Sequence, residues 1–508
     1  MSISLEPPPR VVQPPPDVAA HEIGHSLKRG AMWTLGSQLA AQALRLASVV
    51  VLARLLTPDD YGAAALAITI STYSMILGDF GYGTALVQSS TASQRRASTA
   101  FWCALAAGAI GAGCVALAAY PAARAFDEPQ VAGLVIGGGL TLFLVGVGSA
   151  SNALLTRSMR FRAIQTATLV ASIAATACGI TAAALGAGPW ALVLPQIVLA
   201  LLTSAAFILA ARWRPSLEFS RSAFRSLSAF AFPFTGGSAF FVLHGVVAVV
   251  VIGQVAGLAD LGIWNLSMAI VIVPMSLLAA PISRVIYAAF ARMRDDSERI
   301  AELWLRGFAL MAAVLLPTFF GLIALAPDLI PFVFGEQWVA AVPVVQTLCA
   351  LVMVRSLQTW NEPVMDSAGR PQVAMFLTGS VLLALPPCIW LGSKFGIEGI
   401  AVGYCFAALV GELLSFLITT RQLSLKPLTV LRSLRGILPS AVAACLGVVL
   451  ARSALEDLGV SLELRLLISI VVGVSIYVPC LALFSRSVAV ELLWIARGLG
   501  LKTRRSPS

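Results

Sequence analysis

Apolar residues gather along this chain into long runs that are separated by short, charged loops. Fourteen runs hold about twenty mostly apolar residues each, the length that an α-helix needs to cross the hydrocarbon core of a bilayer. The predicted spans cover residues 31–56, 62–88, 98–120, 131–154, 164–186, 189–211, 228–252, 261–283, 307–326, 339–363, 373–393, 397–420, 436–451 and 466–484. The pattern therefore predicts an all-α, polytopic membrane protein with about fourteen transmembrane helices.

The composition supports this prediction and leaves little chain for a soluble domain. Hydrophobic residues make up 58% of the sequence, charged residues make up 11%, and the mean hydropathy is +0.89. A soluble globular protein has roughly 45–50% apolar and about 25% charged residues. The N-terminal stretch lacks the features of a cleavable signal, so the first span is expected to direct insertion. The eight cysteines all lie in apolar runs without a C-x-x-C pair, and they are predicted to be core residues.

The charges of the loops predict which side of the membrane each loop occupies. Of the 34 Lys and Arg residues, 27 lie in the tails and in loops on the side of the N-terminus, five lie on the opposite side, and Arg45 and Arg355 lie inside spans. Cytoplasmic loops carry the excess of positive charge, so both termini are expected in the cytoplasm. The same loops account for the net charge of +10, because they would face anionic membrane lipids; no nucleic-acid motif accompanies them.

One motif in the N-terminal tail resembles a zinc site. The segment "HEIGH" (21–25) matches the H-E-x-x-H pattern of metalloproteases. Ala31 stands where the longer motif requires a third histidine, and the only other histidine, His244, lies in an apolar run. Two proline triplets upstream favour extended chain. Residues 1–29 are therefore expected to form a disordered cytoplasmic tail, and no metal or other cofactor is predicted.

The chain matches itself at a shift of about 200 residues. The segment "TPDDYGAAAL" (57–66) aligns with "GLADLGIWNL" (257–266). The paired residues are Asp60 with Asp260, Gly62 with Gly262, Leu66 with Leu266 and, at a shift of 210, Arg160 with Arg370, Gly186 with Gly396 and Ala191 with Ala401. Because each half holds an even number of spans, the repeats are predicted to be parallel and related by an axis along the membrane normal.

The repeat predicts how the chain is divided. Residues 30–212 are expected to form one six-helix lobe and residues 225–421 a second, facing each other across a central cavity. Residues 433–485 add two further helices. Residues 486–508 form a basic tail with an amphipathic helix that is predicted to lie on the cytoplasmic face of the membrane.

Six segments stand out in order along the chain: "ARLLTPDDYG" (53–62), "GDFGYGTALVQ" (78–88), "SMRFRA" (158–163), "PISRVIYAAFARMRDDSERI" (281–300), "GEQWVAAVPVVQ" (335–346) and "GIEGIAVGY" (396–404). Together they resemble the polysaccharide transport family of bacterial oligosaccharide flippases, over about residues 28–421. This family belongs to a superfamily with multidrug-extruding transporters and peptidoglycan-precursor flippases. One departure is Ala288 after Tyr287, where the family often has proline.

The resemblance implies a function and its partners. Members move polyprenyl-pyrophosphate-linked oligosaccharide repeat units across the bacterial inner membrane by alternating access, for the synthesis of exopolysaccharide, capsule or O-antigen. The implied partners are this lipid-linked substrate, H⁺ or Na⁺ as a coupling ion, membrane lipids and the polysaccharide synthesis machinery. The resemblance does not identify the sugar.

Two predicted spans carry a stripe of polar residues. The stripe of span 31–56 consists of Thr34, Gln38, Gln42, Arg45 and Ser48, and that of span 339–363 of Arg355, Gln358, Thr359 and Glu362, continued by Asp366. A guanidinium matches phosphate oxygens, so an arginine in each stripe suits an anionic head group. The predicted substrate-binding residues are Arg45, Arg355, Gln38, Gln42, Gln358 and Glu362. The alternative is that each arginine pairs with an acid of its own bundle, with Glu362 the obvious partner of Arg355.

Three other ionisable residues lie inside predicted spans. Asp79 and Glu412 are candidates for ion coupling, and the alternative for each is a structural pair with a basic residue. A histidine ordinarily titrates in a useful range, which makes His244 a candidate, but a packing histidine that makes a hydrogen bond is the commoner case.

Two rival functions are weighed against transport of an oligosaccharide. A multidrug or cation exporter of the same superfamily would favour an apolar pocket lined by acids rather than by arginines. A membrane glycosyltransferase or O-antigen polymerase would need a long outside loop, and every predicted outside loop has about 15 residues or fewer. Asp59 and Asp60 fit a turn and a helix cap after Pro58 better than a catalytic pair. The chain is therefore expected not to be an enzyme.

The predicted topology can be tested with reporter fusions. Fusions after Arg96, Arg162, Arg225 and Arg435 should report a cytoplasmic position, and fusions after Glu128, Asp260 and Asp457 a periplasmic one. Alkaline phosphatase and a fluorescent protein, read in the same cells, distinguish the two sides. One inverted pair of helices would contradict the division into two parallel halves.

Overall fold

The structure, a computed structural model, describes residues 36, 40–89, 93–279, 297–358, 360, 361, 364, 371–486 and 488–492. All regular elements in this part of the chain are helices, so the predicted all-α class is confirmed. Ten of the described helices are long and apolar enough to cross a membrane. Each of the fourteen predicted spans overlaps a described helix, so that count is compatible with the structure. The "HEIGH" motif, Gln38, Glu362 and most of the basic C-terminal tail lie outside the described residues.

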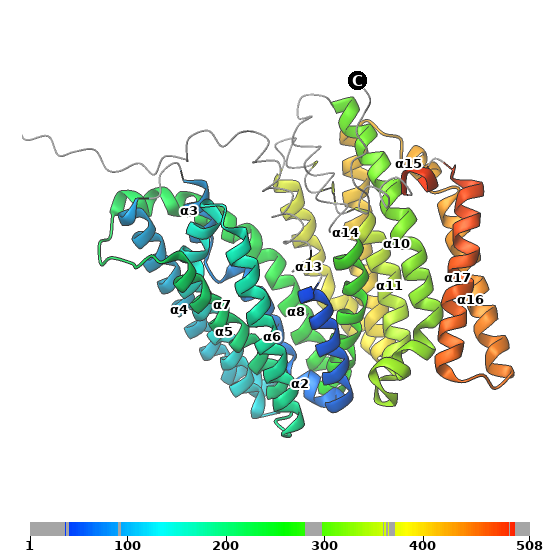
Figure 1. Cartoon of the computed structure of the whole chain (residues 1–508), viewed down its shortest axis with the longest axis horizontal. Helices are drawn as coiled ribbons and strands as arrows, with labels where there is room; N and C mark the ends of the chain where they lie inside the picture. Colours follow the sequence, from blue (N-terminus) through cyan, green and yellow to red (C-terminus); the bar gives the residue numbers. More distant parts are fainter. Residues whose placement is uncertain are drawn as a thin grey trace, which may run out of the picture.

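The N-terminal part of the bundle contains seven described helices. A helix over residues 40–55 is followed by α2 (Pro58–Leu77), α3 (Tyr82–Gln88), α4 (Gln94–Ala125), α5 (Gln130–Arg157), α6 (Phe161–Ala184) and α7 (Trp190–Ala211). Figure 1 shows α4 to α7 grouped on one side of the molecule, with α2 toward the centre.

The C-terminal part begins with a long helix that joins the two groups. The elements are α8 (Arg221–Pro274), the π-turn η1 (Met275–Ala279), α10 (Ser297–Phe334), the 3₁₀ turn η2 (Glu336–Trp338), α11 (Ala341–Leu357), α13 (Pro371–Ser393), α14 (Gly396–Gln422), α15 (Pro427–Ser433), α16 (Ile437–Asp457) and α17 (Leu462–Phe484). In Figure 1, α10, α11, α14, α16 and α17 form the second group, and α8 lies between the groups.

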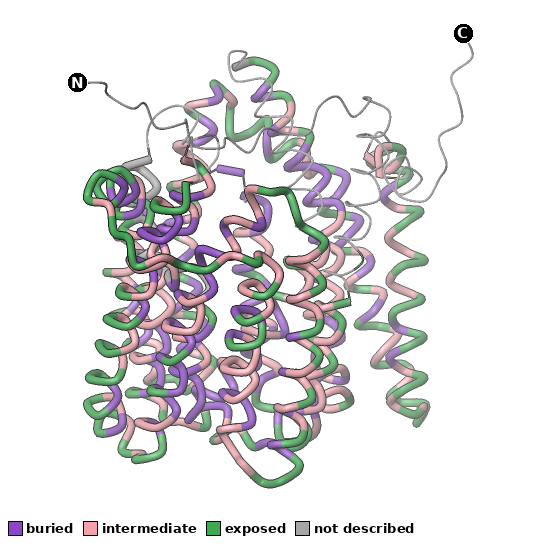
Figure 2. Tube along the Cα trace, turned by 60° about the vertical axis from the view of Figure 1, so that its left-hand side comes forward, coloured by how far each residue is buried: buried purple, intermediate pink, exposed green. Residues whose placement is uncertain are grey.

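Burial is distributed as a membrane requires. Buried residues follow the inner faces of the helices and exposed residues the outer faces (Figure 2). Many exposed side chains are large and apolar: Leu117 is 80% exposed, Leu383 79% and Leu467 60%. Such surface is costly in water and favourable against lipid tails, which supports the membrane assignment.

The start of α2 confirms that Asp60 caps a helix. The Thr57 hydroxyl accepts a hydrogen bond from Asp60 N–H at 3.3 Å, and the Asp60 carboxylate accepts one from Thr57 N–H at 2.9 Å. These two bonds form a capping box, with Pro58 at the first helical position and Asp59 in the first turn. Both acidic residues therefore stabilise a helix start, as acidic groups do at the positive end of the helix dipole.

The predicted span 62–88 is wrong as a single helix. The helix begins earlier, at Pro58, and the chain leaves it for a turn before α3. In that turn, Phe80 (φ 47°) and Gly81 (φ 76°) adopt left-handed backbone. The Asp79 carboxylate accepts a hydrogen bond from Gly81 N–H at 2.9 Å. A side chain that binds a backbone N–H competes with the helical hydrogen bonds, and this ends α2.

Two predicted spans, 228–252 and 261–283, are joined within α8. The helix breaks at Gly257, where φ is 86° and ψ is 179°. Glycine adopts this backbone without the steric penalty that a Cβ would bring. Pro233 lies inside the first limb of the helix and Pro274 at the end of the second.

Residues paired by the repeat have the same environment in both halves. Gly186 and Gly396 both adopt positive φ, 77° and 72°. Ala191 and Ala401 are both fully buried. These matches, more than 200 residues apart, support the internal repeat.

A cluster of charges attaches the last two helices to the bundle. Asp328 of α10, with a side chain only 5% exposed, is 3.1 Å from Arg452 of α16 and 2.8 Å from Arg465 of α17. Glu456 approaches both arginines at 3.6–3.8 Å from the exposed side. One buried carboxylate therefore connects three helices.

The other basic residues of the predicted outer side also have local partners. The Arg124 guanidinium lies 5.0 Å from the ring centre of Tyr120, and the Lys394 ammonium lies 4.9 Å from that of Trp390. Arg54 donates hydrogen bonds to backbone carbonyls at the end of α10. Each of the five exceptions to the charge asymmetry therefore has a structural contact.

Removal of the Asp328 carboxylate tests this attachment. Asp328→Ala leaves Arg452 and Arg465 without their buried partner, and we expect a loss of about 3–5 kcal/mol in stability. Thermal unfolding of the purified protein in detergent measures it. Glu456→Ala, whose carboxylate is 54% exposed, is the matched control and should cost less than about 1 kcal/mol. Equal effects of the two variants would contradict the assignment.

Candidate functional site

Arg45 lies near the middle of the predicted span 31–56, on the helix over residues 40–55. It is ten residues from the end of that helix, which corresponds to about 15 Å of a hydrocarbon core about 30 Å thick. Its side chain is exposed, and within the described part of the chain it makes no hydrogen bond and no ion pair. A guanidinium in this position is available to an anionic ligand.

The polar face that carries Arg45 meets the C-terminal half of the chain. Gln42, one turn away, donates a hydrogen bond to the hydroxyl of Ser276 in η1 at 2.9 Å. This contact joins residues that are 234 positions apart. Arg45 is therefore next to a contact between the halves.

Arg355 pairs with Glu412 across two helices. The Arg355 Nε of α11 lies 3.8 Å from the Glu412 carboxylate of α14, and the two side chains are 42% and 21% exposed. The sequence pattern predicted Glu362 as the partner of Arg355, and Glu362 lies outside the described residues. Glu412, a candidate for ion coupling, is thus brought to the predicted substrate-binding arginine.

Aromatic residues from both halves lie in the region of this pair. The rings of Trp264 and Tyr404 meet edge-on at 4.8 Å, and the His244 ring lies 6.0 Å from Tyr404. Arg355 is within electrostatic reach of His244 and Tyr404, and also of Tyr73 on α2. Tyr73 belongs to the N-terminal half, whereas Arg355 and Glu412 both belong to the C-terminal half.

Polar side chains continue this site just after the end of α11 and on α14. The Asn361 amide donates hydrogen bonds to Gln358 at 2.8 Å and to Ser415 of α14 at 3.1 Å. Asn361 is 2% exposed, and its carbonyl oxygen has no hydrogen-bond partner among the described residues. The predicted residue Gln358 therefore belongs to a buried network that follows Arg355, and Asn361 and Ser415 are members that the sequence analysis missed.

Asp79 has a local role in the structure. One carboxylate oxygen accepts the Gly81 N–H, and the other accepts a hydrogen bond from Ser149 of α5 at 3.4 Å. These bonds hold the turn between α2 and α3 against α5. Asp79 therefore lies in a turn, and no hydrogen bond or ion pair described for it involves Arg45 or Arg355.

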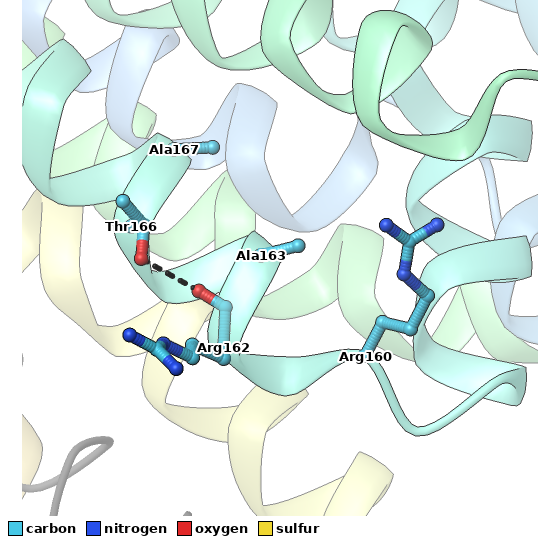
Figure 3. Close-up of a pocket in the computed structure, with 5 residues that line it drawn as sticks. All are labelled: Arg160, Arg162, Ala163, Thr166 and Ala167. Carbon is cyan, nitrogen blue, oxygen red and sulfur yellow. Dashed lines mark hydrogen bonds between the residues drawn. The ribbon is translucent and has the colours of Figure 1, made fainter.

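An open hollow of about 500 Å³ lies at the start of α6. Arg160, Arg162, Ala163, Thr166 and Ala167 line it (Figure 3). Arg160 is held by a hydrogen bond to the carbonyl of Ala210 at 2.9 Å, and Thr166 donates one to the carbonyl of Arg162 at 2.8 Å. The hollow is basic and lies on the side of the arginine-rich loops. Its lining residues belong to other segments than the predicted spans that carry Arg45 and Arg355.

No group of three or more His, Cys, Asp or Glu side chains in the described part of the chain could hold a metal ion. The described cysteines are all free thiols. The described residues near Arg355 are a glutamate, amides and aromatic rings.

These features define a multi-pass membrane protein with an arginine–glutamate pair in its C-terminal half. Residues 51–343, more than half of the chain, match the family described as polysaccharide biosynthesis protein. The chain belongs to this family, as the resemblance of its motifs indicated.

Two curated relatives and one solved structure are similar to most of the chain. The succinoglycan biosynthesis transport protein ExoT of Rhizobium meliloti is 25% identical over 95% of this chain and 98% of its own. The lipopolysaccharide biosynthesis protein WzxC of Escherichia coli is 24% identical over 77% of this chain and 80% of its own. The structure of the lipid II flippase MurJ in an inward closed conformation has a TM-score of 0.71 at 14% identity, over 91% of this chain and all of the other, and shows a shared fold.

Proposed function

We propose that this protein is a flippase that moves a lipid-linked oligosaccharide repeat unit across the bacterial inner membrane by alternating access. The observation that carries the proposal is family membership, supported by the similarity to ExoT over nearly the whole of both chains. ExoT is named as a transport protein and MurJ as a flippase for a lipid-linked precursor. The chain is accordingly a transporter and not an enzyme. The excess of Lys and Arg in the loops on the side of the N-terminus supports the placement of both termini in the cytoplasm.

The two arginines support binding of the anionic part of the substrate. The relatives are named after different products, succinoglycan and lipopolysaccharide, so the sugars differ among them. A carrier lipid with a phosphate or pyrophosphate link is the chemistry that such substrates have in common. Arg45 and Arg355 are positive groups inside spanning helices, and a guanidinium binds phosphate oxygens strongly where water is scarce. An exporter of cationic drugs has no use for two such residues.

The two arginines have different roles in this mechanism. Arg45 has no hydrogen-bond or ion-pair partner among the described residues and takes the anionic link directly. Arg355 exchanges Glu412 for the substrate, because a pair at 3.8 Å is looser than a hydrogen-bonded salt bridge of 2.8 Å. Protonation of Glu412 would release Arg355, so Glu412 is the better candidate for coupling to H⁺. Asp79 is less suited, since its oxygens are engaged in a turn.

Substitution of Arg45 tests the proposal. Arg45→Ala should lower export of the polysaccharide about ten- to hundredfold, since a hydrogen bond to a charged group contributes about 1.5–3 kcal/mol. Lipid-linked repeat units should accumulate while the abundance of the protein is unchanged. Arg45→Lys keeps the charge but loses the bidentate geometry, and should retain part of the activity.

The matched control is Arg221→Ala, which removes an exposed arginine from the start of α8, outside the membrane. It should export normally. Surface polysaccharide, lipid-linked intermediates and protein abundance are measured in the same strains. Normal export by Arg45→Ala, or a loss of export explained by loss of the protein, would refute the role of this arginine.

A further inference from the structure

The two halves touch through bare backbone at one point. A Cβ on Gly62 of α2 would overlap the carbonyl oxygen of Leu258, and a Cβ on Gly262 of α8 would overlap the carbonyl oxygen of Pro58. The first turn of α2 and the first turn of the second limb of α8 therefore cross with no side chain between them. Only glycine permits this approach.

The crossing has the symmetry of the repeat. Gly62 and Gly262 are repeat partners, and Pro58 and Leu258 are related by the same shift of 200 residues. Residue 62 contacts residue 258, and residue 262 contacts residue 58, which is the reciprocal pattern found at a twofold axis. The crossing therefore lies on the axis that relates the two halves.

A second pair of contacts flanks the crossing, and it follows the same shift. The Ala53 carbonyl accepts hydrogen bonds from the Gln337 amide at 2.7 Å and from the Trp338 indole at 2.8 Å. Gly253, the repeat partner of Ala53, lies against the ring of Phe126. An aromatic residue of each half thus covers the turn of the other half.

Polar contacts complete the closure. Arg54 donates to the carbonyls of Phe332 and Val333, and Gln337 donates a second hydrogen bond to the Leu56 carbonyl at 3.0 Å. The Trp338 ring is fully buried and meets the Tyr61 ring edge-on at 5.0 Å. These donors and rings thus contact backbone carbonyls or one another and do not interlock. Such contacts can break when two rigid groups of helices move apart.

We propose that this crossing is the gate that closes the path at the end opposite the arginine-rich loops. Gly62 and Gly262 form its point of closest contact, here called the pivot. The proposal rests on the proposed function, which requires the path to open at each end in turn. The closed gate depends on backbone contact at the pivot, and the aromatic covers and Arg54 hold it shut. A single methyl group at either glycine keeps the halves apart.

Alanine substitution at the pivot provides the first test. Gly62→Ala and Gly262→Ala should each hold the gate open and lower export, because over-packing of this size shifts an equilibrium by roughly ten- to hundredfold. Gly113→Ala in α4 and Gly321→Ala in α10 are matched controls, since a Cβ there meets no atom within 4 Å. Both controls should export normally.

Opening of the gate can be measured without any substrate, by the rate at which a cysteine behind the gate is labelled. Ser48→Cys, five residues inward of Ala53, is introduced into a chain whose eight cysteines are replaced, and intact cells are treated with a membrane-impermeant maleimide. Labelling should be slow with the native glycines and faster by about tenfold with either alanine. Unchanged labelling at normal protein abundance would overturn the proposal.

A second variant covers the case in which the alanines fail to fold. Arg54→Ala removes hydrogen bonds across the gate and adds no bulk, so it should also speed labelling of Ser48→Cys, by a smaller factor. If Arg54→Ala leaves labelling unchanged, the crossing is a fixed structural contact. Normal export by Arg45→Ala together with a labelling response at Gly62 would refute the head-group role and leave the gate standing, so the two failures are distinguishable.

Discussion

The hydrocarbon core of the membrane offers no hydrogen-bond partner to the backbone, and the architecture of this protein depends on that constraint. Each N–H and C=O must be satisfied within its own segment, which leaves helices as the regular elements of the described chain. The helices are interrupted only where another feature compensates. Asp79 binds the N–H of Gly81 after α2, and Gly257 adopts a backbone that a Cβ would oppose.

Helices inside a bilayer are already surrounded by apolar lipid tails, so they gain little from the hydrophobic effect when they associate. Their association depends on close packing instead. Small residues make this possible here. Gly62 and Gly262 bring two helices into backbone contact, and within the second half Gly392 and Gly399 do the same for α13 and α14. The contact at Gly62 and Gly262 joins the two halves, whereas the contact at Gly392 and Gly399 lies within one half. The same packing device therefore builds each half and lets the halves meet without interlocking side chains.

The internal repeat relates the glycines and alanines that shape and pack the helices, but it does not relate the two arginines inside the predicted spans. Gly186 and Gly396 share a backbone conformation, and Ala191 and Ala401 share full burial. By contrast, the position of Arg45 corresponds to Gly245, and that of Arg355, at the shift of 210, to Val145. Neither arginine has a charged counterpart in the other half. A symmetric frame thus carries two arginines that are placed asymmetrically.

The sequence by itself determined the all-α class, the approximate position of most apolar runs, the family, and the presence of arginines inside two predicted spans. These follow from hydropathy and helical periodicity, which are local properties of the chain. Periodicity also placed Gln42 and Gln358 on the faces of Arg45 and Arg355. It cannot say which helix lies opposite a face.

Only the tertiary structure decided the partners across the bundle. Arg355 meets Glu412, 57 residues away, although Glu362 lay on its own stripe. Asp328 meets Arg452 and Arg465, and Gly62 meets Leu258. The break after α2 belongs to the same group, since an apolar run reads as one span until the Asp79 side chain takes a backbone N–H from the helix. The physical reason is common to all of them: a local pattern fixes which face a residue occupies, whereas its energy depends on the neighbour that the packing of distant segments supplies.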